Sequence, residues 1–194
     1  MKIELLERME VPPLHYYAVV SDIPDSCPHK KHLITYLNNF VDNINQGRGF
    51  LFHGDYGQGK SAAACILLKA AAVMKRTGLF IMCGKLPHLI WKDIQFDEEQ
   101  SYYERMLAVD LLVLDELIFF DNKSDYLLEQ IIRERLNLMR STIITTNLPI
   151  KGPNSISEKY PALTNVMTEY VLPVRFSGHN FRESLAEDIK RDFQ

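Results

Sequence analysis

The segment Gly54–Ser61, GDYGQGKS, restricts the fold of this 194-residue chain more than any other part of its sequence. It fits the pattern G-x-x-x-x-G-K-[ST], in which glycines let backbone N–H groups turn inward around phosphate oxygens. The apolar run FLFH comes directly before it, and the Ala-rich run 61–78 after it is typical of a helix. We therefore expect a phosphate-binding loop. The alternative is a glycine-rich turn that only caps a helix.

The residues of this loop have separate tasks in binding a nucleotide with its metal ion. The helix after the loop adds the partial positive charge of its N-terminus. We expect Lys60 to reach the β and γ phosphates and the Ser61 hydroxyl to coordinate Mg²⁺. The expected nucleotide-binding residues are Gly54, Asp55, Tyr56, Gly57, Gln58, Gly59, Lys60, Ser61 and Ala62.

A second motif is the run LLVLDEL at 111–117, which is apolar without alternation and so predicts a strand buried on both faces. It places Asp115 and Glu116 at the end of the strand, where parallel sheets bind their ligands. We expect Asp115 to hold Mg²⁺ through a water, and Glu116 to orient and deprotonate the water that attacks the γ-phosphate. An Asp-Glu pair that only caps the next turn is the alternative.

The third motif is STIITTNLP at 141–149, a β-rich run with a polar end. If this strand lies beside the strands at 49–54 and 110–117, Asn147 reaches the attacking water or the γ-phosphate and reports whether that phosphate is present. A turn-forming Asn is the alternative.

The order of these patterns along the chain predicts an α/β fold with a parallel sheet. We expect residues 1–27 to be an irregular arm, punctuated by prolines, and residues 28–194 to be one ATPase domain. Strands are expected at 49–54, 79–83, 110–117, 141–147 and 170–176. Helices are expected at 29–45, 61–78, 85–94, 97–109, 124–140 and 180–193.

Composition narrows the class of protein. Hydrophobic residues make up 46% and charged residues 24%, which excludes a disordered chain, and the net charge of -3 removes any overall basic excess. The three cysteines form no Cys-x-x-Cys pair, so neither a disulfide framework nor a zinc site is indicated. Because there is no long apolar run and the start MKIELLERME is too charged for a signal peptide, we expect a cytoplasmic protein without membrane contact.

In their order and spacing, the three motifs resemble those of the AAA+ branch of P-loop ATPases. More closely, DLLVLDEL, QIIRERLNLMRSTIITTNLP and PVRFSGHNFR resemble the DnaC/IstB group, whose members load replicative helicases or assist transposases. The resemblance implies a three-layer α/β/α P-loop NTPase with a five-stranded parallel sheet in the order 5-1-4-3-2. It also implies ATP and Mg²⁺ as ligands, and single-stranded DNA plus a replicative helicase or transposase as partners.

Matched position by position, the resemblance assigns Walker A to Gly54–Ser61, Walker B to Asp115 and Glu116, and sensor 1 to Asn147. It assigns the sensor 2 arginine to Arg182, whose guanidinium fork suits phosphate oxygens. A solvated surface arginine is the alternative for that residue. The expected catalytic residues are Glu116, Lys60, Asn147 and Arg182, with Ser61 and Asp115 as the metal ligands.

Two features depart from the family pattern. The arginine that completes a neighbour's site would fall near Asn165 or Val166, and neither residue supplies a cation. Arg133 and Arg135 are candidate substitutes, although a helix face with alternating charges is more often only solvated. The irregular residues 1–27 are also too few to form the additional domain with which such loaders grip a helicase, so loading would need another docking surface.

The candidates for DNA contact are scattered cationic and aromatic side chains. Trp91 has apolar neighbours at helical spacing and is more often core than a base-stacking platform. The tract at 93–105 is acidic and aromatic and suits a protein partner, with Tyr102 and Tyr103 at its surface. The candidates are His29–His32, Lys85, Trp91, Lys92 and Arg105.

Together these features predict an ATPase, slow without its partner, that acts as a nucleotide-controlled switch in DNA replication or transposition and forms nucleotide-dependent homo-oligomers. Two alternatives remain open. A small P-loop nucleotide or nucleoside kinase would also have this length, but we find no arginine-rich lid between 121 and 136. A nucleotide-binding interaction module with negligible hydrolysis is the second.

Overall fold

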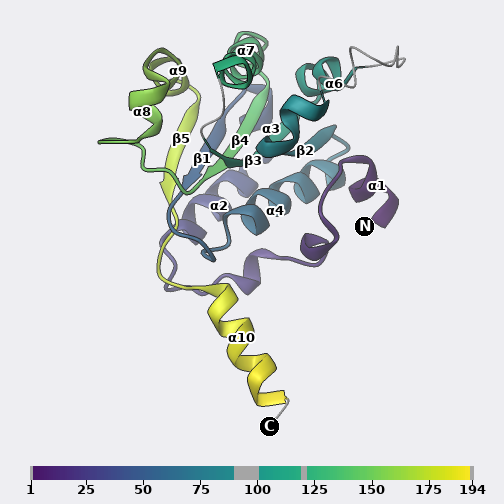
Figure 1. Ribbon diagram of the computed structural model, residues 1–194. Helices are drawn as coiled ribbons and strands as arrows, with labels where there is room; N and C mark the ends of the chain where they lie inside the picture. The colour runs from purple at the N-terminus through teal and green to yellow at the C-terminus, as the bar shows by residue number, and fades with distance from the viewer. Residues whose placement is uncertain (1, 90–100, 119–121, 193–194) are drawn as a thin grey trace.

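The computed structural model describes residues 2–89, 101–118 and 122–192, and its centre is a five-stranded parallel sheet (Figure 1). The strand order is β2-β3-β4-β1-β5, which is 5-1-4-3-2 when read from the opposite edge. The strands are β1 (Gly49–His53), β2 (Gly78–Met82), β3 (Leu111–Leu117), β4 (Ser141–Thr146) and β5 (Val171–Arg175).

Helices cover both faces of this sheet, so the predicted three-layer α/β/α fold is confirmed (Figure 1). Successive strand side chains point to opposite faces: Phe50 and Phe52 pack on one side, and Leu51 packs on the other. One layer contains α1 (Ile3–Arg8), α2 (His29–Asn38), α3 (Phe40–Asn45) and α4 (Lys60–Val73). The other contains α6 (Tyr102–Ala108), α7 (Asn122–Asn137), α8 (Ile156–Lys159) and α9 (Pro161–Met167).

The last helix, α10 (Phe181–Asp192), extends away from the sheet at the C-terminal end (Figure 1). Of the helices within the described ranges, none is both long and apolar enough to cross a membrane.

Several helix boundaries differ from the sequence expectation. The helix predicted at 29–45 is broken at Asn39, whose backbone lies outside the helical region, with φ −117° and ψ 31°. The helix predicted at 85–94 begins with a 3-10 turn, η3 (Cys83–Lys85), and continues as a helix over 86–89; the rest of it lies outside the described residues. The two short helices α8 and α9 were not predicted.

The expectation that residues 1–27 are irregular is correct only in part. They contain α1 and two 3-10 turns, η1 (Pro13–His15) and η2 (Val20–Asp22). The side chains of Leu6, Val11 and Ile23 are buried in the same core as α4, and Phe80 of β2 donates its N–H to the Met9 carbonyl at 2.8 Å. Apolar side chains therefore fix this arm on the sheet layer, although prolines interrupt its regular structure.

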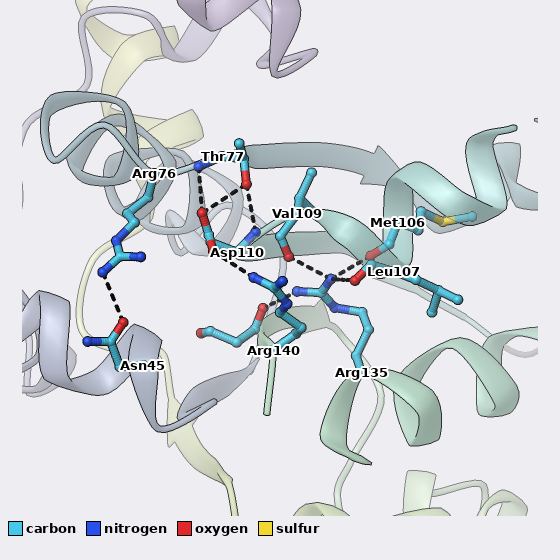
Figure 2. Close-up of polar contacts among 10 residues, drawn as sticks. Asn45, Arg76, Thr77, Met106, Leu107, Val109, Asp110, Arg135 and Arg140 are labelled. Atoms are coloured by element: carbon cyan, nitrogen blue, oxygen red, sulfur yellow. Dashed lines mark hydrogen bonds and ion pairs between the residues drawn. The ribbon is translucent and has the colours of Figure 1, made fainter. Parts of the chain in front are cut away.

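Arg135, expected on a solvated helix face or as a substitute arginine finger, is completely buried (Figure 2). Its guanidinium donates to the carbonyls of Met106, Val109 and Ser141 and to the Thr142 hydroxyl. Burial lowers the pKa of Arg135 to about 9, and the charge of Arg140 contributes in the same direction. Arg135 therefore joins α7 to the end of α6 and the start of β4, and it is not available to a neighbouring molecule.

Candidate nucleotide-binding site

The three predicted motifs surround one cavity of about 520 Å³ at the C-terminal ends of the strands. Its lining includes the loop after β1 and the first turn of α4. The ends of β3 and β4, the start of α10 and the N-terminal arm line it as well. From the predicted set it is lined by Tyr56, Gly57, Gln58, Gly59, Lys60, Ser61, Ala62, Asp115, Glu116, Asn147 and Arg182.

The glycines of the loop are required by its backbone and by close neighbours. Gly54, Gly57 and Gly59 have φ values of 135°, 76° and 86°, a backbone region that residues with a side chain rarely adopt. A Cβ at Gly54 would lie 2.4 Å from the Phe176 carbonyl oxygen, and one at Gly57 would lie 2.1 Å from Asn180 Oδ1. The loop can lie this close to Phe176 and Asn180 only because Gly54 and Gly57 have no side chain.

Lys60 begins α4 and is almost completely buried under the loop. Its ammonium group donates to the carbonyls of Gly54 at 2.8 Å and Asp55 at 2.6 Å. Burial lowers the pKa of Lys60, while the negative charges of Asp55 and Asp115 oppose that shift. The amine therefore braces the loop and lies in the same cavity as the acidic residues of β3.

Asp115 is held by a residue that the sequence did not single out. The Thr145 hydroxyl of β4 donates to Asp115 Oδ1 at 2.7 Å, and it accepts a hydrogen bond from the Glu116 N–H at 2.9 Å. The signal that could have found Thr145 is its position two residues before Asn147 in the neighbouring strand. This hydrogen bond orients the Asp115 carboxylate, and within the described residues no hydrogen bond is given to its second oxygen.

Glu116 has a backbone conformation that is unusual for a residue with a side chain. Its φ is 58°, in the left-handed region, and the pairing of β3 with β4 shifts register between Leu114 and Leu117. Such a bulge turns a side chain out of the alternating pattern of the strand. The Glu116 side chain is exposed at the cavity although its neighbours in β3 are buried. Backbone strain of this kind is concentrated at functional sites.

The start of α10 contacts the loop directly. The Phe181 N–H donates to the Gly57 carbonyl at 2.9 Å, and Asn180 Oδ1 accepts from the Arg182 N–H at 3.1 Å. These contacts place Arg182 on the rim of the cavity, where its positive charge contributes to lowering the pKa of Lys60 after the larger effect of burial. Asn147, at the end of β4, lies on the cavity wall as well.

The N-terminal arm supplies a wall of the cavity that the sequence did not predict. Burial lowers the pKa of His15 within this wall, and the charge of Asp115 opposes that shift. Pro12 and Pro13 mark the segment in the sequence, but they carry no signal of what it covers. The arm residues that line the cavity are Pro12, Leu14, His15, Ala18, Val19, Asp22 and Ile23.

A family model described as "IstB-like ATP binding protein" matches residues 28–172. The chain therefore belongs to the IstB-like ATP binding proteins. This confirms the family expected from the sequence motifs, and it identifies ATP as the nucleotide of this family. A comparison with curated proteins found no match.

Solved structures similar to this IstB-like chain include that of the DnaC helicase loader, with 22% identity, a TM-score of 0.70, and coverage of 86% of this chain and 100% of that one. The structure of DnaI has 18% identity and a TM-score of 0.68, and the match covers 93% of this chain and 94% of that one. A replication initiator DnaA bound to AMPPCP and single-stranded DNA has 14% identity and a TM-score of 0.68, and the match covers 94% of this chain and 56% of that one. At these identities the likeness establishes a shared fold.

The residues in this IstB-like cavity fit ATP and Mg²⁺. The N–H groups of Gly57, Gln58 and Gly59 donate to no acceptor within the described ranges, which leaves them for phosphate oxygens. Hydroxyl and carboxylate oxygens are the ligands that Mg²⁺ prefers, and Ser61 and Asp115 offer one of each at the same cavity.

The other sequence candidates lie away from the cavity or have structural roles. His29 lines the cavity, is buried, and stacks on Phe176 with ring centroids 3.9 Å apart, so its side chain is not exposed as a DNA contact would require. Arg105 pairs with Glu10 at 3.1 Å and lies over the ring of Tyr102. Lys85 is exposed, and Asn165 is exposed on α9, where Val166 also lies. Arg133 pairs with Glu129, and Tyr103 donates to Glu134. Trp91 and Lys92 lie outside the described residues.

Proposed function

We propose that this IstB-like chain hydrolyses ATP and uses the bound nucleotide as a switch in DNA replication or transposition. The observation that carries the proposal is the joint position of Lys60, Asp115 and Glu116 around one cavity. A site that only bound a nucleotide would have no need for a strained carboxylate-bearing residue at the end of β3.

Binding would begin at the loop after β1. The free N–H groups of Gly57–Gly59 would donate to phosphate oxygens, and Lys60 would exchange the carbonyls of Gly54 and Asp55 for the β and γ phosphates. Ser61 and Asp115 would hold Mg²⁺, with the Asp115 contact made through water. When bound, the metal neutralises charge that develops on the phosphate oxygens. The arm would cover the base and ribose with Leu14 and Val19.

Hydrolysis would depend on Glu116 as the general base. Its carboxylate would take a proton from a water molecule as the water oxygen bonds to the γ phosphorus. The bond from that phosphorus to the β–γ bridging oxygen breaks, and ADP and phosphate leave. Asn147 would orient the water, and Arg182 would stabilise charge on the γ-phosphate.

The switch would act on a partner and on DNA. The likeness to a DnaC helicase loader, and to a DnaA bound to single-stranded DNA, supports a replicative helicase and single-stranded DNA as targets. Membership of the IstB-like family supports a transposase as the alternative protein partner. Arg135 is buried and Asn165 is uncharged, and Arg133, the other arginine of α7, pairs with Glu129 on its own helix. We therefore expect slow turnover until a partner is present.

One variant tests the binding site, and one measurement on the wild type tests the assembly. Lys60→Ala should weaken ATP binding at least tenfold in a calorimetric titration, because it removes the cation that faces the phosphates. Light scattering should detect a larger species when ATP and single-stranded DNA are added to the wild type. Equal ATP affinities for wild type and variant would refute the site. A strict monomer with no DNA affinity would refute the loader function.

A further inference from the structure

Lys69 is a buried lysine outside the phosphate-binding loop. It lies on α4, the helix that begins with Lys60, and only 8% of it is exposed. Its ammonium group donates to the carbonyl of Tyr16 at 3.2 Å and to the carbonyl of Ala18. Burial lowers its pKa, and the charge of Asp22 is among the opposing influences. No carboxylate forms an ion pair with it within the described ranges.

Both carbonyls belong to the part of the arm that lines the nucleotide cavity. We call residues 12–23 the strap. The strap contains only the short 3-10 turns η1 and η2, and Tyr16 and Ala18 lie between them. Within the strap, the Val19 N–H donates to Asp22 Oδ2 at 2.9 Å, which fixes the second turn but does not join the strap to the domain. Lys69 makes that connection at the middle of the strap.

Lys69 adds a polar connection to a strap whose apolar packing is uneven. Ile23 is buried at the end of the strap, whereas Tyr16, Ala18 and Val20 are only partly buried against the core. Leu14 is 84% exposed and Tyr17 is 80% exposed. A buried ammonium without a carboxylate is unfavourable unless several acceptors surround it. Its presence here is explained if a fixed strap position matters more than the stability that an apolar residue would add.

We propose that Lys69 is a positioning residue that fixes the strap as the wall for the nucleoside part of ATP. The proposal rests on the proposed function of the cavity. One helix would then carry two lysines with different targets: Lys60 at its start for the phosphates, and Lys69 further along for the wall that faces the base and ribose. Loss of Lys69 would leave phosphate binding intact and weaken only the contribution of the nucleoside.

The experiment compares two probes, MgATP and magnesium tripolyphosphate, by calorimetric titration of the full chain. For Lys69→Met we expect a roughly tenfold loss of ATP affinity and a change of less than about twofold for tripolyphosphate. Lys69→Arg keeps a cation that can reach carbonyl oxygens and should recover part of the ATP affinity. Lys75→Met is the matched control, because Lys75 is exposed just beyond the same helix and should change neither affinity.

A second measurement on the wild type does not depend on how the variants fold. In hydrogen exchange, ATP should protect the amides of residues 12–23 together with the loop, whereas tripolyphosphate should protect the loop alone. The proposal is overturned if Lys69→Met weakens both probes equally or neither, or if both probes protect the strap alike. Failure of the proposed function would differ, since Lys60→Ala would then bind both probes as well as the wild type.

Discussion

Glu116 combines a strained backbone with an exposed carboxylate, because the strained conformation turns its side chain toward the cavity. In the regular pairing of a β-strand, its side chain would point into one of the two packed layers. The left-handed φ of 58° and the shifted register turn it to the cavity instead. A left-handed conformation costs a residue with a side chain about 1 kcal/mol, because Cβ approaches the backbone carbonyl oxygen.

Glu116→Gly should therefore raise the free energy of unfolding by about 1 kcal/mol and lower the rate of ATP hydrolysis by at least a hundredfold. Urea unfolding and a phosphate-release assay measure the two effects. Met139→Gly is the control, since Met139 has a similar φ of 52° at an exposed position away from the cavity. It should stabilise the fold without changing hydrolysis. A destabilised Glu116→Gly protein would contradict the account of strain.

His29 predicts a pH dependence of stability. Burial, and to a lesser extent the charge of His32, lower the pKa of His29 to about 4 in the folded protein, against about 6.5 in an unfolded chain. The unfolded chain therefore binds more protons below pH 6.5, so stability is present above that pH and falls as the pH drops toward 4. The loss at pH 5 should be roughly 2 kcal/mol.

The variant His29→Phe keeps a ring against Phe176 but cannot titrate. Urea unfolding at pH 7 and pH 5 should show a smaller loss for this variant than for the wild type. Parallel losses in the two proteins would show that other groups account for the acid sensitivity.

Among the elements, those with an unbroken apolar pattern could be predicted from the sequence. The five strands and the helix after the phosphate-binding loop lie where the sequence predicts them, because burial on both faces leaves little choice of residue. The break at Asn39 and the helices α8 and α9 could not be predicted. Each depends on tertiary packing, and segments as short as α8 and α9 have too few residues to show a period.

Arg135 illustrates the same difficulty for a single side chain of a helix. In the sequence it belongs to an alternating charge pattern, which favours a solvated face. In the structure it satisfies carbonyl groups at the turn between α6 and β3, while Arg140 pairs with Asp110 at 2.7 Å nearby (Figure 2). Which of two arginines is buried depends on where free carbonyl groups of a distant turn fall, and no local pattern encodes that.

Arg135→Met should lower the free energy of unfolding by about 3 kcal/mol, because several buried carbonyl groups lose their donor. Arg133→Met on the same helix is the control. Arg133 is partly exposed and pairs with Glu129 one turn away, so its loss should change stability by no more than about 0.5 kcal/mol. Chemical unfolding of both variants gives the comparison. Similar losses for both would contradict the structural role of Arg135.

For the molecule as a whole, the site motifs could be predicted but the enclosure of the site could not. The loop, the acidic strand and Asn147 belong to local patterns with a chemical meaning. The strap and the start of α10 reach the same cavity from the two ends of the chain (Figure 1). Their sequences have no pattern that specifies this meeting, since contacts between distant segments follow from the completed fold.

The contact between α10 and the loop links the C-terminus to nucleotide binding. Gly57→Ala would place a Cβ 2.1 Å from Asn180 Oδ1 and should displace the start of α10, with a loss of at least tenfold in ATP affinity. Limited proteolysis near α10 should become faster. Gly84→Ala is the control, because a Cβ there meets nothing within 4 Å and should leave both measurements unchanged. Unchanged ATP affinity in Gly57→Ala would show that α10 is independent of the loop.

The most direct test of the central claim is a single-turnover measurement with Glu116→Gln. This change keeps the size of the side chain and removes the base, so ATP should bind with the wild-type affinity while phosphate release slows at least a hundredfold. The measurement should be made with single-stranded DNA present, so that the wild type has a target. Equal rates of phosphate release in the two proteins would contradict the assignment of Glu116 as the base of an ATPase.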